Sequence, residues 1–250
     1  MSISGEPPLW LLTRWALAQV AAEPAVRDRL RGARLCQLLG VGQDPLPGLG
    51  AVPVVTAGAV ARLQEAVTGN QLPAGTRALL YDPEAWPFTP SAEQRDPAGA
   101  TGRAAALAHR HGLRLIVAPA LSLTNVLAPG KAPRWRRFLD LGLAAALAPA
   151  ADVIELQAQS LERDTASYAA FVRAAAEQAR AANPRVVVLA GLSTNPPGAP
   201  VHGRHLAAAV QATRELVDGY WLNIPRPGKH CPTCNPPRPR LGAELLHAAL

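Results

Sequence analysis

Two carboxylates spaced two residues apart give the clearest chemical signal in the sequence, in the run Tyr81-Asp82-Pro83-Glu84. Side chains of a β-strand alternate between its two faces, so Asp82 and Glu84 are expected to share one face and Tyr81 the other. Neighbouring carboxylates repel each other as anions, and at least one of them then holds its proton closer to neutral pH. We therefore predict that Glu84 is a general acid and that Asp82 assists it.

Aromatic residues flank this pair. Tyr81, Trp86 and Phe88 lie within four residues of a carboxylate, and aromatic rings beside paired acids favour a site that stacks on a ring-shaped substrate. We predict that Tyr81 and Trp86 contact that substrate. The alternative is a surface turn, in which Asp82 caps backbone amides and Glu84 faces water.

A second polar face is expected in the segment 152–159. There Glu155, Gln157 and Gln159 alternate with apolar residues, so all three point away from the helices if the segment is a strand. Buried polar groups must be paired with one another, with water or with a ligand. We predict that Gln157 and Gln159 contact a ligand, with a purely structural network as the alternative, and that the deeper Glu155 is structural.

Two later apolar segments also end in polar groups. Trp221 and Asn223 share one face of the segment 217–223, where Trp221 would form the floor of a pocket or be an ordinary core residue. Asn195 follows another apolar run and is predicted to bind substrate at the rim. His202, in the loop that follows, is a further candidate for a general base.

These residues need a scaffold that brings the ends of many strands together. Short runs rich in Val, Leu and Ile alternate with Ala-rich helical stretches, which is typical of parallel β/α proteins. Eight such runs occur: Leu9–Thr13, Ala33–Leu39, Val52–Thr56, Arg77–Asp82, Leu113–Ala118, Asp152–Gln157, Arg185–Gly191 and Val217–Asn223. We predict one (β/α)8 TIM-type barrel over residues 1–250, with the site at the carboxyl ends of the strands.

The helices and loops follow from the same pattern. Helices are expected over Thr101–His111, Tyr168–Ala182 and Gly242–Leu250, with room for one helix between each pair of strands, whereas Pro45–Pro53 is expected to be a loop. If the stretch from Leu9 to Ala22 were instead one amphipathic helix, an open doubly wound sheet would replace the barrel.

The strand-end residues resemble those of chitinase and hevamine-type glycoside hydrolases. The resemblance covers about the last two-thirds of the chain and is carried by five short matches: Tyr81-Asp82-Pro83-Glu84, Ala118-Pro119, Gln157, Gly191-Leu192 and Trp221. It implies hydrolysis at an N-acetylated sugar, with Glu84 protonating the leaving oxygen and Asp82 orienting the substrate's own acetamido group. This chain departs from the family's pattern at Arg77 and Leu80, where the family has two further acids, and it has no counterpart of the family's sixth-strand tyrosine.

A Pro-rich segment at about 225–240 contains His230, Cys231 and Cys234. A Cys-x-x-Cys pair with a neighbouring His can bind zinc, form a disulfide or remain as free thiols. A closed structural zinc site needs four ligands, and the sequence offers no second pair nearby. We therefore predict no metal and no cofactor, since no Gly-x-Gly-x-x-Gly or phosphate-binding loop follows any strand either.

Composition narrows the remaining classes. The chain has 250 residues, 49% of them hydrophobic, and a net charge of +7, which excludes disorder as its main state. Arginines are scattered and aromatic residues make up only 4% of the chain, so nucleic-acid binding is not expected. No apolar run reaches the roughly 18 residues of a membrane helix, and the first residues lack the pattern of a signal peptide. We expect a cytoplasmic protein with no membrane partner.

The sequence thus favours a glycoside hydrolase-like enzyme acting on a small glycosylated or N-acetylated sugar, with a small molecule or carbohydrate as its partner. Two other readings stay open. One is a non-catalytic barrel that binds a carbohydrate or a partner, and the other is a biosynthetic lyase or isomerase in which Glu84 acts as a base.

Overall fold

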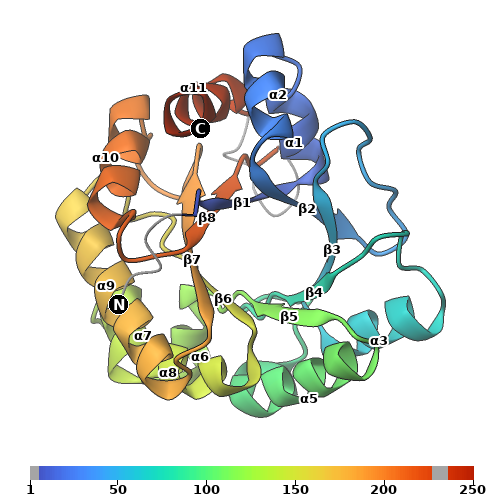
Figure 1. The fold of residues 1–250 in the computed structure, drawn as a ribbon. Helices are drawn as coiled ribbons and strands as arrows, with labels where there is room; N and C mark the ends of the chain where they lie inside the picture. The colour runs from blue at the N-terminus through green and yellow to red at the C-terminus, as the bar shows by residue number, and fades with distance from the viewer. Residues whose placement is uncertain (1–5, 227–235) are drawn as a thin grey trace.

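The computed structural model describes residues 6–226 and 236–250. Eight parallel strands form a closed barrel in chain order, with β8 paired to β1 (Figure 1). The strands are β1 Leu9–Thr13, β2 Arg34–Gly40, β3 Val52–Ala57, β4 Ala78–Tyr81, β5 Arg114–Val117, β6 Val153–Leu156, β7 Val187–Ser193 and β8 Gly219–Asn223. The predicted (β/α)8 barrel is confirmed.

Helices surround the barrel on its outer side (Figure 1). They are α1 Arg14–Val20, α2 Pro24–Arg31, α3 Val60–Thr68, α4 Ser91–Arg95, α5 Pro97–Arg110, α6 Thr124–Leu127, α7 Arg134–Asp140, α8 Leu143–Leu147, α9 Thr165–Ala182, α10 Gly203–Thr213 and α11 Pro239–Ala249, with 3-10 turns η1 Leu121–Leu123 and η2 Ala148–Ala150. The three predicted helices correspond to α5, α9 and α11, and each begins about one turn earlier than expected. Asp96 and Asp164 explain this for α5 and α9, since each accepts a backbone hydrogen bond as the N-cap.

One connection departs from the prediction of a helix between every two strands. Residues 41–51, between β2 and β3, contain no helix. The segment is short, and Gly42, Gly48 and Gly50 all have positive φ angles that an α-helix does not use. The chain therefore returns along the outside of the barrel as the expected Pro/Gly loop.

The first strand decides between a barrel and an open sheet. Leu9–Thr13 is a strand and α1 begins at the next residue, because the Thr13 hydroxyl oxygen accepts a hydrogen bond from Ala16 N at 3.1 Å and caps the helix. Closure also needs Gly219, where any Cβ would collide with the backbone of Leu9 on β1. The alternative of one helix from Leu9 to Ala22 is therefore wrong.

The apolar residues form two layers. One layer fills the barrel and is contributed by alternate strand residues, such as Leu11, Leu38, Leu80 and Leu189. The other layer lies between the strands and the helices and contains the residues in between. Because the inner layer is apolar at depth, polar side chains that continue the inward face at the carboxyl ends of the strands reach the mouth of the barrel.

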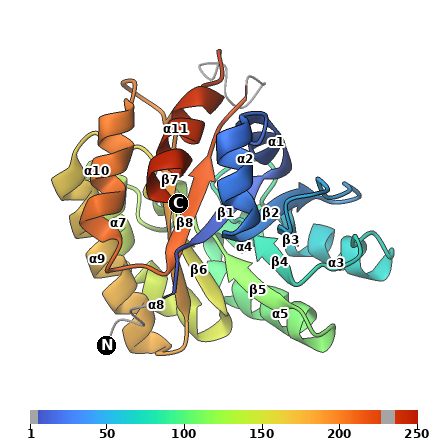
Figure 2. The ribbon, with the colours of Figure 1, turned by 45° about the horizontal axis from the view of Figure 1, so that its top comes forward.

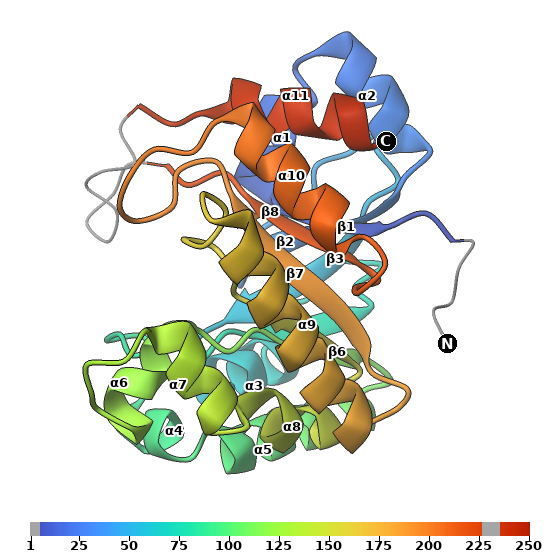
Figure 3. The same cartoon turned by 90° about the vertical axis from the view of Figure 1, so that its left-hand side faces the viewer.

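The helices cover the barrel unevenly. α10, α11 and α2 lie next to one another around β7, β8 and β1 (Figure 2). The short helices α4, α6 and α7 gather beyond the ends of β4 and β5 (Figure 3), so the connections there build up one side of the mouth. No helix within residues 6–226 and 236–250 is long and apolar enough to cross a membrane.

Candidate active site

The predicted carboxylates lie at the mouth of the barrel. Ala78 and Leu80 of β4 belong to the inner layer, and the same alternation directs Asp82 and Glu84 into a cavity of about 680 Å³. The cavity is lined by Asp82, Glu84, Trp86, Ala120, Leu121, Ser122, Arg134, Trp135, Gln157, Gln159, Ser160, Leu161, Ser193, Asn195, Pro197, Trp221, Asn223 and Pro225. Eight of the nine predicted site residues are in this set.

Asp82 is fixed by a neighbouring strand. The amide nitrogen of Gln157, just beyond β6, donates to Asp82 Oδ1 at 2.8 Å and to the backbone oxygen of Ala118 at 2.9 Å. Gln157 therefore ties the ends of β4, β5 and β6 together. Its hydrogen bond favours the ionised form of Asp82, because the donor stabilises negative charge.

Glu84 sits in a turn that holds it over the cavity. The hydroxyl oxygen of Thr89 accepts hydrogen bonds from Glu84 N at 3.1 Å and from Trp86 Nε1 at 2.9 Å, and Ser122 Oγ accepts one from Ala85 N at 3.0 Å. The segment is thus a turn, as the alternative interpretation expected. Its side chains nevertheless line the cavity, so the turn presents Glu84 and Trp86 to the mouth.

A third carboxyl group lies below the pair. Glu155 of β6 is fully buried, and neither of its oxygens has a hydrogen-bond partner among the described residues. Gly191 of β7 leaves the room for it, since a Cβ there would collide with both Glu155 and Gln159. The glycine explains how two long polar side chains fit inside the barrel.

All three carboxyl groups have raised pKa values. Burial raises the pKa of Glu84 to about 7. Burial, and then the charge of Glu84, raise the pKa of Asp82 well above its usual range, against the hydrogen bond from Gln157. Burial, followed by the charges of Asp82 and Glu84, also raises the pKa of Glu155 well above its usual range. The cavity therefore retains carboxylic acid protons near neutral pH.

Three tryptophans surround the acids. Trp86 packs edge-on against Phe88, with ring centroids 5.0 Å apart. Trp221 of β8 is 8% exposed and its Nε1 has no hydrogen-bond partner among the described residues. Trp135 of α7 lies beneath the Arg136 guanidinium, 5.0 Å from the ring centroid. Together they give the cavity aromatic walls.

A buried glutamate holds the opposite rim. Glu162 is fully buried, and its carboxylate accepts hydrogen bonds from Ser160 N at 2.7 Å and Ser193 N at 2.8 Å. Ser160 has φ of 87°, a left-handed conformation that is rare for a non-glycine residue. Burial raises the pKa of Glu162 to about 7 against these hydrogen bonds. Glu162 thus joins the loop after β6 to the last residue of β7.

One predicted site residue lies elsewhere. Tyr81 is completely buried in the outer layer, where its hydroxyl donates to Glu93 Oε2 at 2.8 Å. The prediction that Tyr81 contacts substrate is corrected, because its position between Leu80 and Asp82 turns it to the opposite face of β4. His202 also does not line the cavity: it is the N-cap residue of α10.

Other predictions fall outside the described part of the chain. His230, Cys231 and Cys234 belong to residues 227–235, which the structure does not describe. In the rest of the chain, apart also from residues 1–5, no group of three or more His, Cys, Asp or Glu side chains is placed to hold a metal ion.

Sequence reasoning overlooked Trp135, Arg134 and Glu162. The two α7 residues look like part of a solvated basic run with Arg136 and Arg137. Their place in the chain could have indicated that Arg134 and Trp135 line the site. They lie in the connection after β5, which begins at the carboxyl end of the barrel, where the site lies. Glu162 carries no such signal, because its role depends on a loop and the end of a strand that only the fold brings together.

Comparisons with known proteins agree with the fold. No protein-family model matches the sequence, and no curated protein matches it. Among solved structures, a chitinase from Chromobacterium violaceum has 13% identity and a TM-score of 0.54, covering 97% of this chain and 99% of its own. The PgaB glycoside hydrolase domain from Bordetella bronchiseptica has 10% identity and a TM-score of 0.50, covering 98% and 99%.

A further similar structure is a sugar phosphate isomerase/epimerase from Parabacteroides distasonis, with 10% identity and a TM-score of 0.51, covering 99% of this chain and 97% of its own. At these identities the similarity establishes the barrel, which glycoside hydrolases and isomerases share. Function has to be argued from the cavity.

Proposed function

We propose that this protein is a glycoside hydrolase-like enzyme that cleaves a small N-acetylated sugar substrate, with Glu84 as general acid and Asp82 assisting. The observation that carries the proposal is the placement of both carboxyl groups in one aromatic-walled cavity at the barrel mouth, where burial raises the pKa of Glu84 to about 7. A carboxyl group with such a pKa is protonated in a large share of molecules at neutral pH and can donate.

Glycosidic bond cleavage needs a proton at the leaving oxygen. Glu84 supplies this proton from the rim of the cavity, and its turn is held by Thr89 and Ser122 so that the donor does not swing into solvent. In the second half of the reaction the Glu84 carboxylate takes a proton from the incoming water, as microscopic reversibility requires.

Asp82 is suited to the acetamido group of the substrate. Its Oδ1 already accepts from Gln157, so its position is fixed, and its other oxygen is available to accept from the N–H of an acetamido group. That contact would turn the acetamido oxygen towards the anomeric carbon and stabilise the positive charge that develops on nitrogen as the oxygen attacks.

The aromatic walls suit a sugar ring. Trp86, Trp135 and Trp221 present flat apolar surfaces around polar groups from Gln157 and Gln159, a combination that binds the apolar faces and the hydroxyl edges of a sugar at the same time. The similar chitinase and glycoside hydrolase structures support the proposal at the level of the scaffold.

The test is release of product from a panel of N-acetylglucosaminides and short chito-oligosaccharides. Wild type and a matched control, Glu177→Gln on the exposed side of α9, are expected to turn over a member of the panel. Glu84→Gln is expected to lose about 10²- to 10⁴-fold in kcat/KM while keeping its fold. Absence of turnover by wild type on every member would overturn the proposal, and equal turnover by Glu84→Gln would remove Glu84 as the acid.

A further inference from the structure

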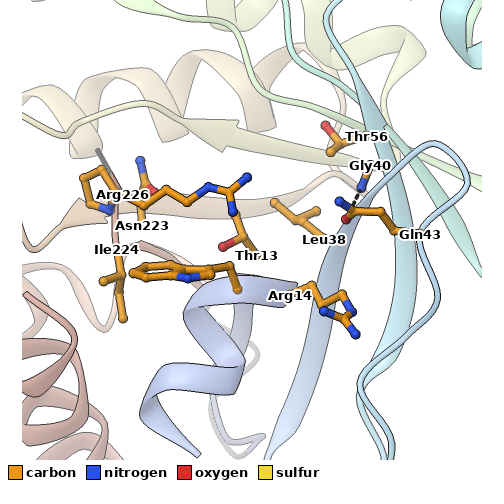
Figure 4. Close-up of a pocket in the computed structure, with 11 residues that line it drawn as sticks. Thr13, Arg14, Leu38, Gly40, Gln43, Thr56, Asn223, Ile224 and Arg226 are labelled. Carbon is orange, nitrogen blue, oxygen red and sulfur yellow. Dashed lines mark hydrogen bonds between the residues drawn. The ribbon is translucent and has the colours of Figure 1, made fainter. Parts of the chain in front are cut away.

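A second cavity opens at the same end of the barrel. It has a volume of about 310 Å³ and is lined by Thr13, Arg14, Trp15, Leu38, Gly40, Gln43, Thr56, Asn223, Ile224, Pro225 and Arg226 (Figure 4). These residues come from the ends of β1, β2, β3 and β8. Asn223 and Pro225 line both this cavity and the one that holds Asp82 and Glu84, so the two cavities adjoin.

The lining of the second cavity is rich in hydrogen-bond donors. None of its eleven residues is Asp or Glu, whereas two are arginines. In Figure 4 the guanidinium of Arg226 reaches over Thr13, on the side of the cavity where Asn223 lies. Arg14 is directed away from it, and its Nε donates to the backbone oxygen of Asp44 at 2.7 Å. Among the lining residues that the structure describes, Arg226 is therefore the cation that faces the cavity.

The neutral groups add to this donor character. Thr13 Oγ1 accepts from Ala16 N at 3.1 Å, which leaves its hydroxyl hydrogen free to donate. Gln43 Oε1 accepts from Gly40 N at 3.0 Å, as drawn in Figure 4, so the amide nitrogen of Gln43 is the end that can serve a ligand. A guanidinium with hydroxyl and amide donors, in the absence of a lining carboxylate, fits the oxygens of an anion.

We propose that this cavity is an anion subsite, and that the substrate of the Asp82 and Glu84 cavity carries a carboxylate or phosphate group. The inference rests on the proposed function for the identity of the sugar portion. A molecule that spans Asn223 would place its acetamido-bearing ring near the acids and its anionic group near Arg226. The separation also keeps the negative group away from Asp82 and Glu84, which would repel it.

The experiment is direct binding by calorimetry, with no turnover needed. The probes are N-acetylglucosamine, its 6-phosphate and N-acetylmuramic acid, which differ in having no anionic group, a phosphate or a carboxylate. Wild type is expected to bind at least one anionic sugar about tenfold or more tightly than the neutral one, with the preference falling as salt is added. Comparing the phosphate and carboxylate arms identifies which anion is accepted.

Arg226→Gln is expected to bring the affinities for the anionic and neutral sugars within about twofold of each other. The matched control is Arg185→Gln, which removes the same charge from an exposed residue at the opposite end of the barrel, before β7, and is expected to keep the preference. Thermal melting of each variant establishes that it is folded.

Three results would overturn the inference: no measurable binding of either anionic sugar, equal affinity for neutral and anionic sugars, or a preference that survives in Arg226→Gln. These outcomes are separate from those of the hydrolysis test. An anion preference without hydrolysis would retain this subsite and reject the proposed hydrolase, and hydrolysis without an anion preference would do the reverse.

Discussion

The two cavities at the barrel mouth occupy equivalent places on one scaffold and differ in the charge of their linings. On one side the segment after β4 carries Asp82 and Glu84, which lie above Glu155 of β6. On the other side the described lining, from the ends of β1, β2, β3 and β8, contains only neutral groups and the two arginines Arg14 and Arg226. Strand geometry is the same on both sides, so the side chain at each strand end decides which half can donate a proton and which half can hold an anion.

The connections that follow the strands differ in the same way. After β4 and β5 the chain builds α4, α6 and α7 beyond the strand ends, and these connections contribute Trp86 and Trp135 to the wall of the acidic cavity. After β1 the helix α1 begins at once, and after β2 there is only a loop. Longer connections thus supply aromatic side chains to the wall of the acidic cavity.

Paired substitutions in the two cavities give the largest expected contrast. Asp82→Asn removes the carboxyl oxygen that would accept from the acetamido N–H and is expected to lower kcat by about 100-fold or more. Thr56→Val, a change of similar size in the second cavity, is expected to leave kcat within about threefold and to act on KM. Steady-state kinetics on the best substrate of the panel measures both.

The contrast between the two cavities would fail if Asp82→Asn changed KM alone, because removal of a group that only binds the ground state leaves kcat unchanged. A large loss of kcat in Thr56→Val would likewise show that the second cavity takes part in the chemistry. Circular dichroism of both variants is the control for folding.

The pH dependence of the reaction tests the acidic cavity and has the next largest expected effect. Glu84 must be protonated to act as an acid, and its pKa is about 7, so kcat/KM is expected to fall by about tenfold per pH unit above that value. A pH-rate profile measures this fall in kcat/KM. Activity that instead rises through pH 7 would indicate that Glu84 works as a base, as the isomerase or lyase reading requires.

Much of this arrangement could be predicted from the sequence, because strands alternate with a period of two. That rule assigned Asp82, Glu84, Gln157 and Asn223 to the inward face, and the apolar runs gave all eight strands. The same rule places Tyr81 on the outer face of β4. Its predicted substrate contact rested on its aromatic side chain and not on its position in the strand.

Other features depend on contacts between distant segments, which one sequence does not reveal. Glu162 bonds to Ser193 across 31 positions, and Gly191 of β7 makes space for Glu155 of β6. The loop between β2 and β3, in contrast, follows from local Pro and Gly residues, and its part within Pro45–Pro53 was predicted. The second cavity was not foreseen, since its polar groups are single residues on four strands.

Glu162 connects the loop after β6 with the end of β7 at one side of the acidic cavity, and its removal should have a moderate effect. Glu162→Ala deletes acceptors for Ser160 N and Ser193 N and is expected to lower the free energy of unfolding by about 2 kcal/mol. Because Ser160 would then relax from its left-handed conformation, KM should rise as well. Urea denaturation measures the stability, with the exposed Glu177→Ala as control, for which a change below about 0.5 kcal/mol is expected.

If Glu162→Ala destabilised the protein while KM stayed the same, the rim of the acidic cavity would not depend on this carboxylate. Glu162 would then be a structural residue alone, and the difference between the two cavities would rest on Asp82, Glu84 and the tryptophans.

The smallest expected effect concerns Glu155, which lies beneath the acidic cavity and has no counterpart beneath the other. Its pKa is raised by burial in the folded protein, so the folded state binds its proton more tightly than the unfolded state does. Above the ordinary glutamate pKa of about 4.3, the unfolded state gains stability by ionising, and the folded protein is progressively destabilised as pH rises. Glu155→Gln removes this proton linkage.

The variant should therefore be more stable than wild type at pH 8, and nearly equal to it at pH 4, where Glu155 is largely protonated in both states. Urea unfolding at the two pH values measures the difference. An effect of the same size at both would mean that the substitution acts through packing against Gly191 and not through a proton. The raised proton affinity of this half of the mouth would then belong to Asp82 and Glu84 alone.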